Sequence, residues 1–250
     1  IKIEIFAHGA LCVAIAGKCY MSLAKYNSSA NRGVCFQNCR RSYRVIDEET
    51  GFELTLDNKY VMSPKDLCTI SFLDIIIKSW ISILKIEGRG RGPEYVFTTT
   101  KIYKEAIESI DNKKYTKEQI VKWVKELESV FNRGFWHGGY YLGNKLGEWS
   151  NTLGNKATKE KSFIGIVKNY FLKPKVTEII LQAGSLKIND ELLITGPTTG
   201  VVSTKVKSIR INNKKIFCAE KGSSITIPIV ERIRRNDKVF ILKTMTSSQS

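Results

Sequence analysis

Residues 82–93 read SILKIEGRGRGP, and this stretch predicts a strand, a glycine-rich turn and the first turn of a helix. The strand is indicated by the β-rich run from Ile81 to Ile86. Pro93 suits the first turn of a helix, and apolar residues recur at helical spacing from there to Ile110. We therefore assign the first half of the chain to the α/β class.

The other elements of the first half are predicted outward from this stretch. Residues 1–6 alternate like a buried strand whose isoleucines share one face. A hairpin is expected over residues 41–62, and a helix over residues 71–80. A second clear helix is expected to begin at Thr116, to carry an apolar stripe as far as Phe131 and to be stopped by Asn132-Arg133-Gly134.

The second half of the chain is predicted to be all-β. Residues 135–160 are rich in glycine and aromatic residues at their start, and we expect them to form a linker. Short alternating runs follow at 163–167, 177–181, 191–194, 206–211, 215–219, 224–227 and 238–242. Six or seven strands at this spacing are typical of a small β-barrel. The predicted domains are therefore residues 1–134, with the cysteines, and residues 161–250, with the barrel.

Charge and hydropathy narrow the possible partners. The chain has 40 Lys and Arg against 24 Asp and Glu, a formal net charge of +16, which favours a polyanion such as nucleic acid. Most of the surplus lies in the last hundred residues. The longest apolar stretch, residues 70–84, is interrupted by Asp74 and Lys78, so no membrane span is expected. We predict a cytoplasmic protein.

Five of the six cysteines lie within 57 residues of one another, and Cys218 is separate. Without an export signal, they are not naturally read as disulfides. Their spacing does not match the paired Cys-x-x-Cys knuckles of structural zinc sites, whereas an iron–sulfur cluster accepts thiolates from separated loops. The alternative is that they are reduced cysteines packed as small hydrophobic residues.

A set of motifs in the first half of the chain occupies residues 4–12, 17–22, 30–35, 39–43, 63–68 and 82–89. Together these motifs resemble peptidase family U32, the collagenase-like proteases. In the second half, residues 163–165, 188–192 and 196–197 resemble the terminal barrel of the family, which is itself similar to the second domain of translation factors. The resemblance covers nearly the whole chain.

The resemblance implies a fold and a chemistry. The fold is the C-terminal part of a TIM-like barrel followed by a small β-barrel, and a preceding segment or a second chain would complete the TIM-like barrel. The subgroup that the sequence resembles hydroxylates the wobble uridine of tRNA with prephenate as oxygen donor and carries a [4Fe–4S] cluster. By motif position, the cluster ligands are Cys12, Cys19, Cys35 and Cys68, with Cys39 as a fifth thiol that could replace Cys35.

Further site candidates follow from the predicted barrel strand. If its apolar face meets the outer helices, Lys85 and Glu87 point into the barrel near the end of the strand that carries the chemistry of barrel enzymes. The alternative is an internal Lys–Glu ion pair. Lys85, Arg89 and Arg40 are candidates to bind a carboxylate substrate such as prephenate. His8 is a candidate proton donor near the cluster, or simply a hydrogen-bonded histidine.

Two other functions remain open. A collagenase-like peptidase would need an activated nucleophile, but the sequence has no Gly-x-Ser-x-Gly elbow, no His-Glu-x-x-His motif and only two histidines. A non-catalytic RNA-binding module would use the metal only to hold the loops together. The cationic residues expected to neutralise tRNA phosphates are Lys205, Lys207, Arg210, Lys214, Lys215, Arg232, Arg234 and Arg235.

Overall fold

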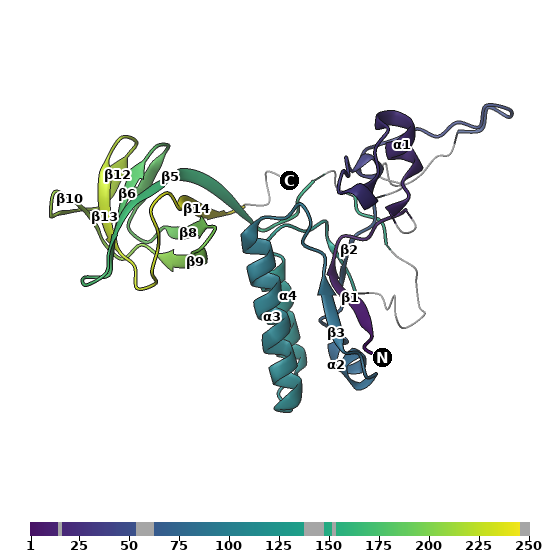
Figure 1. Cartoon of the computed structure of the whole chain (residues 1–250), viewed down its shortest axis with the longest axis horizontal. Coiled ribbons are helices and arrows are strands. Elements are labelled where there is room, and N and C mark those ends of the chain that lie inside the picture. Colours follow the sequence, from purple (N-terminus) through teal and green to yellow (C-terminus); the bar gives the residue numbers. More distant parts are fainter. Residues whose placement is uncertain (15–16, 54–62, 138–147, 152–153, 246–250) are drawn as a thin grey trace. The chain divides into compact units, whose positions relative to one another are not determined.

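The computed structural model describes residues 1–14, 17–53, 63–137, 148–151 and 154–245 (Figure 1). The chain divides into two compact units. Unit 1 consists of Ile1–Arg91 and Thr98–Ala157, and unit 2 of Gly92–Phe97 and Thr158–Ser250. The change from one unit to the other at residue 158 falls within the range expected for the linker.

Unit 1 contains a four-stranded mixed sheet. Its strand order is β3 (Ile83–Ile86), β1 (Glu4–Gly9), β2 (Asp66–Cys68) and β4 (Phe135–Trp136). β1 is parallel to β3, and β2 is parallel to β4, but β1 and β2 are antiparallel. The α/β class is thus confirmed for this unit, while the half-barrel stays a prediction.

Three of the helices in the first half of the chain follow their sequence signals, whereas the short helix at residues 20–26 was not expected. The helices are α1 (Tyr20–Tyr26), α2 (Leu73–Lys78), α3 (Pro93–Asp111) and α4 (Lys117–Leu127), with 3₁₀ turns η2 (Ala30–Arg32) and η3 (Asn38–Arg40). α3 begins at the predicted proline, and the Thr116 hydroxyl accepts a hydrogen bond from the amide of Gln119 at the start of α4. Apolar residues of α3 and α4, such as Ile102 and Leu127, pack against Ile70 and Leu73 in one core.

Two predictions for unit 1 are wrong in detail. Ile1 and Ile3 are exposed, Ile3 to 50%, because β1 begins at Glu4 and only its second half, with Ala7 and His8, is covered. Trp136 and its neighbour Phe135, which we expected in a linker, form β4 and are buried. Alternation and glycine content report local preference, and neither identifies which segment covers a strand.

The predicted hairpin is confirmed within the described residues. Ile46 and Glu53 form an antiparallel bridge, and the amide of Asp47 donates to the carbonyl of Phe52 across the turn. Residues 54–62 of the expected hairpin lie outside the described residues.

Unit 2 is built on one eight-stranded antiparallel sheet, with strand order β11-β10-β13-β6-β5-β14-β8-β9. The strands are β5 (Lys159–Phe171), β6 (Val176–Leu181), β8 (Glu191–Gly196), β9 (Gly200–Lys205), β10 (Ile209–Ile211), β11 (Lys214–Ile216), β13 (Ser224–Pro228) and β14 (Lys238–Thr244). A separate pair joins β7 (Ser185–Lys187) to β12 (Cys218–Glu220). The all-β class is confirmed, but the hydrogen-bonded order of the described strands does not return to its start, so barrel closure stays a prediction.

The core of unit 2 explains why the sequence predicted most of these strands. Inward residues such as Val167, Ile179, Leu192, Ile225 and Val239 are fully buried, and each has a more exposed polar neighbour on at least one side. β7 and β9 were missed because one is only three residues long and the other is polar along most of its length. In the described residues, no helix is long and apolar enough to cross a membrane.

Gly165 lies very close to the backbone of a neighbouring strand and gives a first prediction. A Cβ atom at this position would lie 2.1 Å from the carbonyl oxygen of Ile180, which belongs to the neighbouring strand. We expect Gly165→Ala to lower the free energy of unfolding of unit 2 by about 1–3 kcal/mol, because backbone must move to make room. Urea unfolding followed by circular dichroism measures the change.

Gly154→Ala is the control, because a Cβ there would meet no heavy atom within 4 Å. Equal stability of the two variants would contradict the packing of β5 against β6.

Candidate functional site

The five clustered cysteines are free thiols of unit 1, four of them in the loops and short helical segments after β1 and one in strand β2. Cys12 follows β1, Cys19 precedes α1, Cys35 follows η2, Cys39 lies in η3 and Cys68 ends β2. Cys12 and Cys35 are exposed, Cys19 and Cys39 are half-buried, and Cys68 is buried.

Four of these thiols share one electrostatic neighbourhood. Burial raises the pKa of the Cys39 thiol; Arg40 opposes the rise, and the thiols of Cys12, Cys35 and Cys19 add to it. Cys12, Cys35 and Cys19 are therefore each near enough to Cys39 to influence the charge of its thiol. The hydroxyl and amide of Ser22, which hydrogen-bond the sulfur, lower the pKa of Cys19.

Gly17, in the loop before Cys19, packs closely against the segment that follows α1. Gly17 has a φ of +73°, and a Cβ atom on it would lie 2.5 Å from Oδ1 of Asn31. The hydroxyl of Ser29 donates to the Gly17 carbonyl oxygen at 3.4 Å. This close approach keeps the Cys19 loop against η2 and hence near the segment that carries Cys35.

Cys68 lies in a different environment. Its thiol is fully buried beside Tyr103, and burial raises its pKa to about 12. The Tyr103 hydroxyl donates to the carbonyl of Ala7 at 2.8 Å and accepts from the amide of Thr69 at 3.1 Å. As placed here, Cys68 is a neutral thiol within the core.

The donor set suits a soft metal centre, although the ligand geometry is not formed. In the part of the chain that is described, no three His, Cys, Asp or Glu side chains converge closely enough to hold a metal ion. The chemistry of the group still fits, because thiolates are the ligands of iron–sulfur clusters and four thiols are gathered in adjoining loops.

Beside the thiols, a buried ion pair joins Arg133 to Asp66. Nη1 of Arg133 is 3.6 Å from Oδ1 of Asp66, and the side chains are only 4% and 2% exposed. The amide of Arg133 also donates to Oδ2 of Asp66 at 3.2 Å, and its Nη2 donates to Oε1 of Gln37 at 2.8 Å. Burial raises the pKa of Asp66, and the opposing charges come from Arg133, Arg91 and Arg40. Three arginines thus surround one carboxylate.

Arg40 connects this ion pair to the cysteine loops. Its guanidinium donates to the carbonyl oxygens of Leu11 and Pro64, the latter at 3.0 Å, and to the hydroxyl of Ser63 at 3.3 Å. Since Leu11 precedes Cys12, and Arg40 follows Cys39, the contact fixes two thiol-bearing segments against β2.

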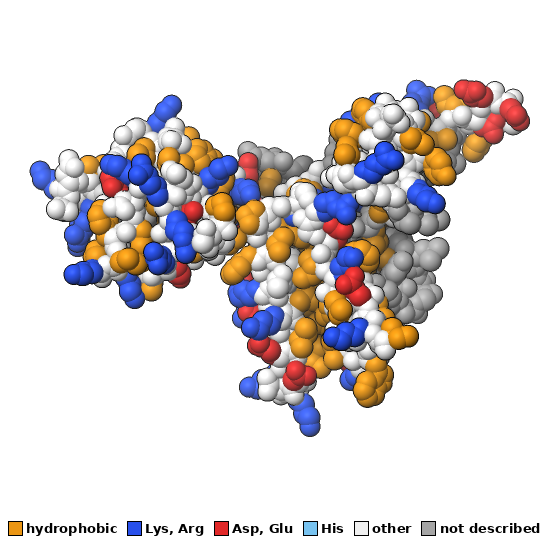
Figure 2. All heavy atoms as spheres, viewed as in Figure 1, with side chains coloured by type: hydrophobic (Ala, Val, Ile, Leu, Met, Phe, Trp, Pro, Cys, Tyr) orange, Lys and Arg blue, Asp and Glu red, His pale blue; other side chains and the backbone are white. Residues whose placement is uncertain are grey.

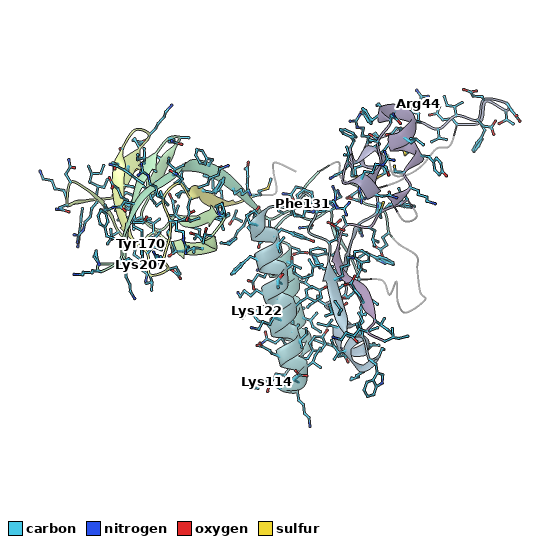
Figure 3. The ribbon with its side chains drawn as sticks, viewed as in Figure 1. Arg44, Lys114, Lys122, Phe131, Tyr170 and Lys207 are labelled. Atoms are coloured by element: carbon cyan, nitrogen blue, oxygen red, sulfur yellow. The ribbon has the colours of Figure 1, made fainter. Side chains whose placement is uncertain are left out.

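Phe131, labelled in Figure 3, gives the arginines an aromatic surface. The guanidinium carbon of Arg91 lies 3.8 Å from the centroid of its ring, and that of Arg133 lies 5.0 Å from it. The sequence indicated no site role for Arg133, and for Arg91 it indicated only that Arg89 and Arg91 could approach a phosphate or form an ordinary helix entry. No spacing rule connects Arg91 and Arg133 to Arg40, so the sequence held no signal that they would meet.

The remaining predicted site residues are dispersed over unit 1. Nζ of Lys85 pairs with Oε1 of Glu4 at 3.1 Å on an exposed surface, and Oε1 of Glu87 accepts from the amide of Arg89 at 2.7 Å. The side chain of Arg89 donates to the carbonyl of Ala30 at 3.1 Å. Among the predicted cations, Arg40 is the one that influences the pKa of a clustered thiol, that of Cys39.

His8 is buried in the core rather than exposed at the loops. Burial, with smaller contributions from His137 and Arg91, lowers its pKa to about 3. Its Nδ1 lies 3.4 Å from the Tyr103 hydroxyl. In this position His8 is neutral at neutral pH, which does not suit a proton donor.

The fold and the site define a class of two-unit protein, in which an α/β unit with clustered thiols is followed by an antiparallel β unit. The chain belongs to peptidase family U32, whose family model matches residues 1–151.

Relatives carry two kinds of name. A protein named "Collagenase" from Porphyromonas gingivalis (strain ATCC BAA-308 / W83) is 50% identical over 240 residues, which are 96% of this chain and 58% of that protein. The "tRNA hydroxylation protein P1" of Bacillus subtilis (strain 168) is 31% identical over 204 residues, 79% of this chain and 47% of that protein.

A third relative has a name that refers to ribosomal RNA. The "23S rRNA 5-hydroxycytidine C2501 synthase" of Escherichia coli (strain K12) is 39% identical over 108 residues, 43% of this chain and 16% of that protein. The chain therefore spans a little more than half the length of the collagenase-named relative, and identity to that relative exceeds identity to the RNA-modifying proteins.

The buried ion pair gives the second prediction. Arg133→Met leaves Asp66 buried without its partner, and we expect the free energy of unfolding of unit 1 to fall by about 3–5 kcal/mol. Thermal or urea unfolding measures the change.

Arg44→Gln is the matched control, because the Arg44–Glu53 pair is 74% and 45% exposed, and an exposed pair contributes little. If both variants unfolded like the wild type, the pair would have no role in stability.

Proposed function

We propose that this chain is part of an iron–sulfur enzyme that hydroxylates the wobble uridine of tRNA, with prephenate as oxygen donor. The observation that carries the proposal is the gathering of Cys12, Cys19, Cys35 and Cys39 beside a cluster of arginines. Two of the relatives are named for hydroxylation of tRNA or synthesis of 5-hydroxycytidine in rRNA, which supports RNA as the substrate.

The thiols would hold a [4Fe–4S] cluster, which supplies electron transfer when bound. We assign the ligands to Cys12, Cys19, Cys35 and Cys68. Cys39 competes for one of these places, because it shares the electrostatic neighbourhood of the first three, whereas Cys68 lies buried beside Tyr103. Ligation by Cys68 would require its loss of a proton in the core.

The arginines would bind and orient the carboxylate substrate. Arg91 and Arg133 flank Phe131. Together with Arg40 they carry three positive charges, more than the single negative charge of Asp66 can balance. Guanidinium groups recognise carboxylates in a fixed planar geometry. Arg40 acts as a positioning residue, because its donors are already taken by Leu11, Ser63 and Pro64.

Unit 2 would hold the RNA backbone. Figure 2 shows Lys and Arg side chains over the visible face of this unit. The predicted cationic residues stand on several of its strands and turns, and most of them are exposed. Their attraction for phosphate is not sequence-specific, so recognition of one uridine would depend on unit 1.

The rest of the TIM-like barrel would be completed by a preceding segment or a second chain. Exposed apolar residues on β1 and β3, Phe6 and Ile83 among them, offer a surface for such packing. β3 is also an edge strand in the described sheet, with β1 as its one partner there.

Peptidase activity is the second candidate, favoured by the 50% identity to a protein named "Collagenase". A cysteine peptidase would need a base next to its nucleophile. His8 is buried in the core, whereas Cys12 is exposed in the loop after β1, and burial is the main cause of the low pKa of His8. The geometry therefore favours the hydroxylase.

Iron and sulfide content of the anaerobically purified protein tests the proposal. We expect Cys12→Ser to lose most of both, together with the tRNA hydroxylation measured by mass analysis of nucleosides. Cys218→Ser is the matched control, since this thiol lies in unit 2, and its iron content should equal that of the wild type.

Three more variants separate the ligands. Cys35→Ser, Cys39→Ser and Cys68→Ser should identify the two that lose iron. Wild-type iron content in Cys12→Ser would refute the cluster site, and hydrolysis of gelatin without any iron would support the peptidase instead.

A further inference from the structure

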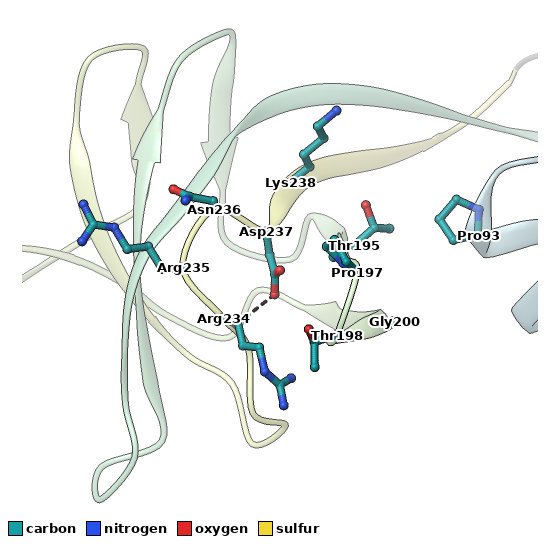
Figure 4. Close-up of a pocket in the computed structure, with 11 residues that line it drawn as sticks. Pro93, Thr195, Pro197, Thr198, Gly200, Arg234, Arg235, Asn236, Asp237 and Lys238 are labelled. Atoms are coloured by element: carbon teal, nitrogen blue, oxygen red, sulfur yellow. Dashed lines mark hydrogen bonds between the residues drawn. The ribbon is translucent and has the colours of Figure 1, made fainter.

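Unit 2 contains a pocket of about 830 Å³ that the proposed function does not yet use. Figure 4 shows it between the turn at the end of β8, Thr195–Gly200, and the segment Arg234–Lys238 that leads into β14. Its volume lies in the range of sites that bind small molecules or parts of larger ones.

A buried carboxylate ties the two sides of the pocket together. Asp237 is 3% exposed, and its Oδ2 accepts from the Thr199 hydroxyl at 2.5 Å and from the amide of Arg234 at 2.8 Å. A Cβ atom on Gly196 would lie 1.7 Å from Oδ1 of Asp237, so only glycine allows this approach. The two segments that line the pocket are therefore fixed to each other without a ligand.

Three cations surround this braced turn: Arg234, Arg235 and Lys238. In the described part of the chain, none of them forms an ion pair with a carboxylate, and the charge of Asp237 is already shared by its two donors. Nη1 of Arg234 donates to the Thr199 hydroxyl at 3.3 Å, which holds the guanidinium beside the turn.

The directions of these side chains favour an extended polyanion over one small anion. In Figure 4, Arg234 runs beside Thr198, whereas Arg235 and Lys238 extend away from the turn in other directions. A single small anion would call for converging donors, but successive phosphates of a strand can be met by diverging ones. The hydroxyl of the exposed Thr198 adds a neutral donor of the kind that often contacts phosphate.

We infer that this pocket binds the sugar–phosphate backbone of the RNA substrate, with one phosphate held by Arg234 and Thr198 and the neighbouring phosphates by Arg235 and Lys238. The inference rests on the proposed function for the identity of the polyanion. It adds the point on unit 2 at which the strand is anchored and the role of Asp237 as the residue that positions this anchor.

Binding of a fluorescein-labelled tRNA transcript, followed by anisotropy from about 50 to 200 mM KCl, tests the pocket. We expect Arg234→Gln and Lys238→Gln each to weaken binding and to reduce the slope of log K against log salt by roughly one, because each removes a phosphate contact. Lys221→Gln, which removes one exposed charge of unit 2 outside the pocket, should retain the wild-type slope.

The outcomes separate the two proposals. If the wild type binds tRNA, but both pocket variants keep the slope and affinity of Lys221→Gln, the pocket is refuted and the RNA substrate stands. If the wild type does not retain tRNA even at the lowest salt, RNA as the substrate is refuted together with the pocket. Because Arg234 contacts Thr199, unfolding of each variant is measured alongside, and Lys238→Gln supplies a variant without such a contact.

Discussion

The structure of unit 1 depends on the buried negative charge of Asp66, which lies where β2 meets the cysteine loops. The residues that balance this charge also connect the surrounding segments to one another. The ion pair with Arg133 brings the turn after α4 onto β2. Arg133 also reaches Gln37, and Arg40 reaches Leu11, Ser63 and Pro64, so that the cysteine loops are fixed to the same point. A buried charge is tolerated only when it is paired, which makes this arrangement sensitive to the loss of any partner.

The same device recurs in unit 2. Asp237 is buried at the start of β14 and binds Thr199 and the amide of Arg234, much as Asp66 binds the amide and guanidinium of Arg133. In each unit, a buried carboxylate fixes a turn, and more than one cationic side chain lies near that carboxylate. The protein can thus present positive charge at fixed positions, which an anionic substrate requires and which mobile surface lysines would not provide.

Membership of family U32 does not decide between the two activities that its relatives are named for. The chain shares half of its aligned residues with a collagenase-named protein and about a third with a tRNA hydroxylation protein. A fold can host unrelated chemistry, so the argument has to come from the site. Here the site offers gathered thiols and arginines, and the fully buried His8 has a low pKa, which supports the proposed redox enzyme more than a peptidase with a nucleophile and a base.

The sequence by itself determined the local elements: the start of α3 at Pro93, the cap of α4 at Thr116, most strands of unit 2 and the presence of a cysteine group. These follow from backbone preference and from periodicity, which act over a few residues. Only the tertiary structure decided that Ile3 is exposed, that Phe135 belongs to a sheet, and that Arg91 and Arg133 meet at Phe131. The tertiary structure also shows that Cys39 and Cys68 have different environments, since Cys39 lies near three other thiols and Cys68 is buried beside Tyr103. Such contacts join residues far apart in the chain, and periodicity identifies a face without identifying the segment that covers it.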